Sequence, residues 1–438
     1  MKWMTTLSPL LLLPLVLFLA NPRDATSQGD TQSAEEAPLP SVSDNAPLEV
    51  EVWGGIRDLY KIAAPLPLGD PALAAEVKDI QENDYRLSSL FKVLDSKSFL
   101  ADLVAEGMEI QKEPWVQVGA QGVVKCRITR AGDAVELRCN LFETTRPDAP
   151  ALARTYKGTP SELRGLVHTW VNEVIRHFTG TPGAFGTQLA FARKHGPGVK
   201  HIYTADWTGG PVSRITRNDS INILPAFGPG GIYYTSFVEG EPFLYRTGQR
   251  QPVLSHPGLN MGATFHGNRM AVVLSKDGNP EIYVGNADGT GLKRLTNSGA
   301  IDVSPSFSPD GSQIAFVSDR HGSPQIFVMS AAGGGAKRVT FQGSYNQTPN
   351  WCPRPGSNLV AFTGRDGGVF DVFTVDVGSG QVRRLTQKQG RNSDPAFSPD
   401  CRQVAFSSSR GGIYVSNPEG LNHIQVLPGE ADTIRWSR

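Results

Sequence analysis

The second half of the chain repeats one hydrophobic pattern: an aromatic residue, a tight polar turn and then a short run of β-branched and aromatic residues. The five aromatic residues lie 38, 42, 44 and 46 residues apart, and they are Phe227, Phe265, Phe307, Trp351 and Phe397. This spacing is typical of β-propellers, in which each repeat forms one four-stranded blade. Apolar and polar residues alternate within the runs, between Gly, Pro, Asp and Asn, which predicts half-buried antiparallel strands.

The two ends of this region predict one further blade that they share. Residues 188–216 supply a second, third and fourth strand without an aromatic first strand, and residues 433–437 supply an isolated strand that contains Trp436. A closed ring of blades leaves fewer bare sheet faces than an open row. We therefore expect an all-β six-bladed propeller over residues 181–438, closed by the C-terminal strand.

A different pattern predicts an α+β N-terminal domain over residues 48–180. Strand-like alternation opens it, and helical spacing of apolar residues follows over residues 71–87 and 160–180. Thr159 and Glu162 form a capping pattern ahead of the second helix. A domain of roughly 130 residues can bury its own core.

Within this domain, the alternation predicts a β-hairpin with Gly132 and Asp133 as its turn. The numbers of two residues that lie opposite each other across the hairpin then sum to 265, so Cys126 lies opposite Cys139. This pair is a non-hydrogen-bonded one, in which Cα atoms approach within about 4.5 Å. In an oxidising compartment we expect a disulfide bond between them; the alternative is two buried free thiols that act as small apolar residues. Cys352 and Cys401 lie in turns of adjacent blades at non-equivalent places in the repeat, so we do not expect them to pair.

The N-terminus predicts export. Residues 1–27 carry a positive charge, a short apolar core and small residues suited to cleavage, which is typical of a secretory signal peptide and too short to span a bilayer. Residues 28–47 are polar and predict a flexible tether. Removing residues 1–27 leaves 40 basic and 41 acidic residues of the 42 and 42 in the whole chain, so nothing in the net charge favours nucleic acid or an anionic membrane as a partner.

Catalytic motifs are absent from the sequence: it contains no Gly-x-Ser-x-Gly, His-Glu-x-x-His or paired Cys-x-x-Cys. The loops that lead into the first strand of each blade instead carry short polar residues, and equivalent loops of a propeller converge on one mouth of its channel. We expect a partner-binding site there; the alternative is that these residues only cap strands. They are Asn222, Asn260, Asp302, Ser304, Gln347, Thr348, Ser393 and Asp394.

The order of these parts resembles the TolB family, the periplasmic propellers of the Tol-Pal system. The resemblance rests on the export signal, the α+β domain that ends in a helix and Gly-Ala-Phe-Gly at residues 183–186, the Phe-Ser-Pro-Asp-Gly blades and the C-terminal Trp strand. It implies a non-enzymatic periplasmic protein that binds the peptidoglycan-associated lipoprotein at one propeller mouth, and that helps to draw the outer membrane inward at division and to keep the envelope intact.

The resemblance also implies that a strand-like N-terminal segment, here residues 48–58, binds the inner-membrane partner TolA. Its candidate contact residues are Val50, Val52, Trp53 and Asp58. A cation in the propeller channel is a further possibility in the family, and the sequence assigns no ligands to it. About 20 extra residues precede the segment, and the blade around Phe227 lacks the usual Asp.

Two other classes of function stay open. A secreted propeller hydrolase or lyase would need clustered carboxylates in the channel, whereas the sequence shows isolated ones. A polysaccharide-binding propeller would line its mouth with exposed aromatic residues, whereas these loops carry Asn, Ser, Asp and Thr.

Overall fold

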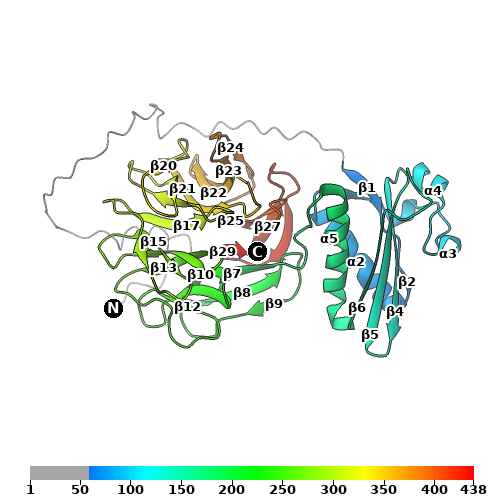
Figure 1. The fold of residues 1–438 in the computed structure, drawn as a ribbon, viewed down its shortest axis with the longest axis horizontal. Helices are drawn as coiled ribbons and strands as arrows, with labels where there is room; N and C mark the ends of the chain where they lie inside the picture. The colour runs from blue at the N-terminus through cyan, green and yellow to red at the C-terminus, as the bar shows by residue number, and fades with distance from the viewer. Residues whose placement is uncertain (1–58) are drawn as a thin grey trace. The chain divides into compact units, whose positions relative to one another are not determined.

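The computed structural model describes residues 59–438, which form two compact units (Figure 1). One unit comprises residues 59–188 together with Asp206–Gly210, and the other comprises Leu189–Ala205 and Pro211–Arg438. The expected signal peptide, tether and N-terminal segment, including Val50, Val52, Trp53 and Asp58, lie outside the described residues. Within residues 59–438, no helix has both the length and the apolar composition needed to cross a membrane.

The first unit is a six-stranded sheet on which two long helices, α2 and α5, pack side by side (Figure 1). The sheet order is β3-β1-β4-β5-β6, with β2 beside β4. Its elements are β1 (Tyr60–Ala63), β2 (Leu68–Gly69), α2 (Pro71–Leu87), β3 (Phe91–Val93), α3 (Leu103–Glu106), α4 (Lys112–Gln117), β4 (Gly122–Ala131), β5 (Ala134–Glu143), β6 (Leu152–Gly158) and α5 (Leu163–Thr179).

Both long helices have a capped start, and the sequence predicted the cap ahead of α5. The side chain of Asp70 accepts hydrogen bonds from the backbone N–H groups of the first turn of α2. A 3₁₀ turn at Pro160–Glu162 precedes α5, and Glu162 accepts a hydrogen bond from the backbone of Thr159. The α5 side chains Trp170, Val171 and Val174 are fully buried, so the apolar stripe of this helix is part of the core of the unit.

The hairpin register is the one expected from the turn. Gly132 adopts a left-handed φ of 62°, and β4 and β5 pair Cys126 with Cys139. The two sulfur atoms are bonded, and the Cα atoms lie 4.1 Å apart. The predicted disulfide is therefore confirmed.

The second unit is a six-bladed propeller, as expected (Figure 1). Each blade is an antiparallel sheet whose first strand lies on the inside of the ring. The six sheets are β10-β11-β12 (Asn222–Gly228, Gly231–Ser236, Phe243–Arg246), β13-β14-β15-β16 (Asn260–His266, Arg269–Leu274, Glu281–Asn286, Lys293–Arg294), β17-β18-β19-β20 (Asp302–Phe307, Gln313–Ser318, Gln325–Ser330, Ala336–Arg338), β21-β22-β23-β24 (Tyr345–Trp351, Leu359–Asp366, Val369–Asp376, Val382–Arg384), β25-β26-β27-β28 (Asn392–Phe397, Val404–Ser408, Gly412–Ser416, Ile424–Pro428) and β29-β7-β8-β9 (Asp432–Trp436, Gln188–Gly196, Val199–Asp206, Val212–Arg214).

The C-terminal strand closes the ring. Strand β29 pairs antiparallel with β7, with Trp436 opposite Leu189 and Arg435 opposite Ala190. The sixth blade is therefore built from both ends of the propeller sequence, which confirms the expected closure.

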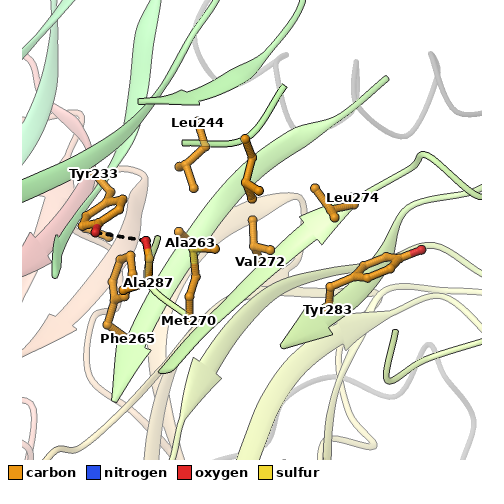
Figure 2. Close-up of a cluster of buried hydrophobic side chains, with 11 residues drawn as sticks. Tyr233, Leu244, Ala263, Phe265, Met270, Val272, Leu274, Tyr283 and Ala287 are labelled. Atoms are coloured by element: carbon orange, nitrogen blue, oxygen red, sulfur yellow. Dashed lines mark hydrogen bonds between the residues drawn. The ribbon is translucent and has the colours of Figure 1, made fainter. Parts of the chain in front are cut away.

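Neighbouring blades are held together by apolar side chains from facing sheets. In Figure 2, Tyr233 and Leu244 of one blade pack with Phe265 and Met270 of the next. The Tyr233 hydroxyl lies 3.1 Å from the carbonyl oxygen of Ala287 and donates a hydrogen bond to it (Figure 2). Each buried aromatic residue in the repeat thus stabilises an interface between blades, because one sheet cannot bury both of its own faces.

The expectation that Cys352 and Cys401 do not pair is wrong. Their sulfur atoms are bonded, and their Cα atoms lie 5.7 Å apart. Both residues belong to one buried apolar cluster that also contains Phe397. Stacking of the blades places the residue that follows a first strand against the turn of the next blade, so unequal positions in the repeat become neighbours in space.

Candidate functional site

In five blades the first or second residue of the first strand is a buried Asn or Asp that is used for structure. Three of these residues are expected partner-binding residues, and each is fully buried. The Asn222 amide donates to the carbonyl of Lys200 at 2.8 Å, and Asn260 exchanges hydrogen bonds with the backbone of His256 at 2.6 and 2.9 Å. Asp302 accepts two hydrogen bonds from Arg320.

This geometry supports the alternative of strand capping for Asn222, Asn260 and Asp302, because their polar atoms hold the preceding loops. The other five expected residues occupy later positions in their strands.

Every first strand also contains a residue with left-handed backbone, which in these five blades lies two positions after the buried Asn or Asp. The φ angles lie between 51° and 68°, and the residues are Leu224, Gly262, Ser304, Thr348, Asp394 and Thr433. At each of them the pairing with the second strand shifts by one residue, as in a β-bulge. Five of the six are not glycine, and left-handed backbone is costly for such residues, so surrounding contacts must enforce it.

Four expected residues line one cavity of about 270 Å³ at this mouth of the channel. They are Gln347, Thr348, Ser393 and Asp394. Ser304 lines a smaller cavity of about 40 Å³ that shares Leu224 and Met261 with the first. The structure thus brings together residues from adjacent blades that are 46 positions apart in sequence.

A buried hydroxyl couples the left-handed residues of two adjacent blades. Thr363 of β22 is fully buried, and its Oγ1 lies 2.7 Å from Oγ1 of Thr348. The same oxygen accepts a hydrogen bond from the backbone N–H of Asp394 at 3.0 Å. The orientation of Asp394 at the mouth therefore depends on the neighbouring blade.

Charges of both signs surround this cavity. Lys200 Nζ lies 2.6 Å from Asp432 Oδ2. Burial raises the pKa of Asp432, and the nearby Lys200 opposes that shift. Lys194, Arg391 and Glu430 also line the cavity, so its positive and negative charges are balanced. Apolar side chains, among them Phe237 and Phe370, make up much of the remaining lining.

Sequence reasoning missed several of these residues. Asp432 could have been found by extending the alignment of the first strands one residue upstream of Thr433. Arg391 directly precedes Asn392 in an equivalent loop, and its guanidinium lies 5.5 Å from the ring of Phe370. Lys200 lies on β8, the third strand of its blade, and no local sequence feature places it near the mouth.

The described residues do not fit the channel cation that the family resemblance allows. Among residues 59–438, no group of three or more His, Cys, Asp or Glu side chains is arranged to hold a metal ion. Lys200 and Arg435 also add positive charge to the cavities of the channel.

Comparisons with known proteins agree for both units. Residues 48–149 match the TolB amino-terminal domain, and residues 175–357 match the TolB beta propeller domain. The Tol-Pal system protein TolB of Anaeromyxobacter sp. (strain K) is 40% identical over 262 residues, which are 56% of this chain and 60% of that protein. The same protein of Desulfosudis oleivorans is 36% identical over 258 residues, 55% of this chain and 58% of that protein. The chain thus spans less than two thirds of the length of these curated relatives.

The crystal structure of TolB from Acinetobacter baumannii is similar over a larger span. The match has a TM-score of 0.77 and 26% sequence identity. It covers 86% of this chain and 96% of the chain from Acinetobacter baumannii. The amino-terminal match precedes the propeller match along the chain, and the solved structure spans both. The chain therefore belongs to the TolB family.

Proposed function

We propose that this protein is a non-enzymatic periplasmic component of the Tol-Pal system that binds the peptidoglycan-associated lipoprotein at the channel mouth lined by Gln347, Thr348, Ser393 and Asp394. Its role is then to maintain the outer membrane and to help it move inward during cell division. The supporting observation is the mouth cavity, in which polar residues of adjacent blades meet charges of both signs.

The chemistry of this mouth suits a protein partner. Charged residues provide hydrogen bonds and fix the register of a partner, and apolar side chains such as Phe237 and Phe370 provide surface to bury. Opposite charges on a partner increase the association rate. The fixed left-handed backbone at Thr348 and Asp394 holds these residues in one orientation, which lowers the ordering cost of binding.

Isothermal titration calorimetry with the purified periplasmic domain of the lipoprotein tests this proposal. Asp394→Lys and Arg391→Glu each reverse a charge at the mouth, and we expect each to weaken binding by about tenfold or more, which corresponds to about 1.4 kcal/mol. Lys337→Glu is the matched control, because Lys337 is an exposed residue of the outer strand β20 and does not line the mouth cavity. Unchanged affinity in both mouth variants would refute the assignment of this surface.

We further propose that residues 48–58 bind TolA. The proposal rests on the alternating sequence of this segment and on the family resemblance. Deleting residues 48–58 should abolish TolA binding and change the affinity for the lipoprotein, because a segment that docks in one of two states shifts affinity through its differential contacts. Calorimetry with each partner measures both effects, and unchanged binding to both would contradict the proposal.

A further inference from the structure

The residue directly before the aromatic position of each first strand differs sharply between blades. Five blades carry a small or medium side chain there, namely Ala226, Thr264, Ser306, Asn350 and Ala396, and the sixth carries Arg435. All six occupy the same place relative to the second strand, two residues after the shift in pairing. Arg435 therefore brings a long charged side chain to a position where the other blades carry shorter uncharged ones.

Arg435 lines a cavity of about 340 Å³ at the C-terminal ends of the first strands. It also lines the cavity of about 40 Å³ that contains Ser304 and Asp319. Arg438 lines the same cavity and is exposed. A volume near 300 Å³ lies at the lower end of the range for small-molecule pockets and exceeds what a few water molecules occupy.

The charge of Arg435 is poorly compensated. Its guanidinium donates one hydrogen bond to the carbonyl oxygen of Ile434 at 2.8 Å, and no carboxylate of residues 59–438 lies within ion-pair distance of it. A guanidinium has five N–H donors and stays charged in proteins. Burial lowers the pKa of Arg435, and the more distant Asp394 only partly opposes this.

Two polar side chains around this cavity already use an oxygen to accept a backbone hydrogen bond. The Ser306 hydroxyl oxygen accepts a hydrogen bond from the backbone N–H of Trp351 at 2.9 Å. Asn350 Oδ1 accepts one from the backbone N–H of Phe397 at 2.8 Å. The lining contains two Arg side chains and no Asp or Glu side chain.

We propose that this cavity binds a small anion with a carboxylate or phosphate group, which Arg435 holds through paired N–H donors and Arg438 attracts at the rim. Paired N–H donors of arginine match both groups geometrically, and such charge-assisted bonds are stronger than neutral ones. None of the four residues of the proposed lipoprotein surface lines this cavity, so the proposal does not depend on that function.

Calorimetry and thermal unfolding of the full chain test this site, with inorganic phosphate and malonate as probes and chloride at matched ionic strength as the reference. We expect one binding site for at least one probe and a rise in melting temperature of about 2–4 °C beyond chloride at saturating concentration. Tighter binding of phosphate or of malonate identifies the preferred group. No stabilisation beyond chloride by either probe would overturn the proposal.

Variants of Arg435 distinguish anion binding at this site from non-specific stabilisation by salt. Arg435→Gln should weaken binding at least tenfold, and Arg435→Lys should weaken it less, because it keeps the charge and loses the paired donors. Arg217→Gln is the matched control, since Arg217 is exposed and outside the cavity. Full anion binding by Arg435→Gln would refute the site.

Crystals of the unmodified protein soaked in selenate provide a check that does not require a folded variant. Anomalous scattering beside Arg435 would support the site. Selenate bound only elsewhere on the protein would overturn it.

Discussion

The stability of this protein should fall as the pH rises from 7 to 9, because of one buried histidine. His168 on α5 is 2% exposed and lies between two carboxylates of the same compact unit. Its Nδ1 is 2.6 Å from Asp84 Oδ2, and its Nε2 is 3.0 Å from Asp206 Oδ2. Arg164 also contacts Asp206 at 3.3 Å. When His168 is protonated, both ring nitrogens donate, and the residue links α2, α5 and the Asp206–Gly210 segment.

The magnitude follows from the pKa of His168. Burial alone would lower it, but the hydrogen bonds and charges of Asp206 and Asp84 outweigh burial and raise the pKa from 6.5 to about 9. A pKa that is higher in the folded state contributes stability that is fully present below the unfolded pKa and is lost as the pH rises through the folded pKa. At 1.36 kcal/mol per pKa unit, the free energy of unfolding should fall by about 2 kcal/mol between pH 7 and pH 9.

Other groups with shifted pKa values titrate mainly outside the range from pH 7 to pH 9. Burial raises the pKa of Asp84 to about 6 against the opposing effect of His168, so its contribution changes at lower pH. The pKa values of His201 and His423 are lowered, chiefly by burial, so their contributions are nearly complete at pH 7. Burial raises the pKa of Tyr85, which faces Asp84, above its usual value near 10.

Urea unfolding followed by tryptophan fluorescence measures the effect, because Trp115, Trp170 and Trp207 are fully buried in the same unit. His168→Gln should destabilise the protein by about 2 kcal/mol at pH 7 and by much less at pH 9, and so remove most of the pH dependence. His177→Gln is the control on the same helix; His177 contacts Glu143 and is partly exposed. A free energy of unfolding that stays constant between pH 7 and 9 in the unmodified protein would refute the reasoning.

Three further predictions concern the propeller. Replacing Cys352 and Cys401 together by Ala should lower the free energy of unfolding by about 2–4 kcal/mol, since the bond closes a chain segment 49 residues long; urea unfolding measures the loss, and an unchanged midpoint would contradict it. Gly262→Ala should lower the free energy of unfolding by about 1 kcal/mol, measured by thermal unfolding. The φ angle of 68° is unfavourable for alanine, whereas the nearest atom to the new Cβ is 3.9 Å away, so the loss comes from backbone strain and not from a clash. Deleting residues 433–438 removes all of β29 except Asp432 and should lower the melting temperature more than either change in a calorimetric scan; equal stability would show that the ring does not need this strand.

Local patterns predicted the hairpin and the blades because both depend on interactions near in sequence. The turn at Gly132 sets the register of β4 and β5, and this register places Cys126 opposite Cys139. The repeat aromatic residues predicted the blades, because every blade must bury the same face against its neighbour. Trp436 extended that pattern to the last strand, which was enough to predict how the ring closes.

Contacts between blades were not predictable in the same way. The bond between Cys352 and Cys401 depends on how two sheets stack, and no periodicity within one repeat contains that information. The burial of Asn222 and Asn260 depends on the fold of the preceding loops. A polar residue before a strand looks the same in sequence whether it faces a partner or holds its own loop.

Because of the left-handed residues, side chains in the two halves of each first strand do not follow one continuous alternation. A one-residue shift at Leu224, Thr348 or Asp394 changes the side-chain alternation halfway along each first strand. Simple alternation over the whole strand therefore misplaces one half of it. Only at Gly262 does the residue type suggest a left-handed backbone, because the other five positions carry Leu, Ser, Thr, Asp and Thr.

Because each non-glycine residue in this conformation costs about 1–2 kcal/mol, neighbouring blades must hold the backbone in place. The hydroxyl of Thr433 does so for Leu224 by accepting its backbone N–H at 3.2 Å, as Thr363 does for Asp394 at 3.0 Å. These bonds cross from one blade to the next. The orientation of the mouth residues, and through the same strands that of Arg435, is therefore a property of the closed ring and not of any single repeat.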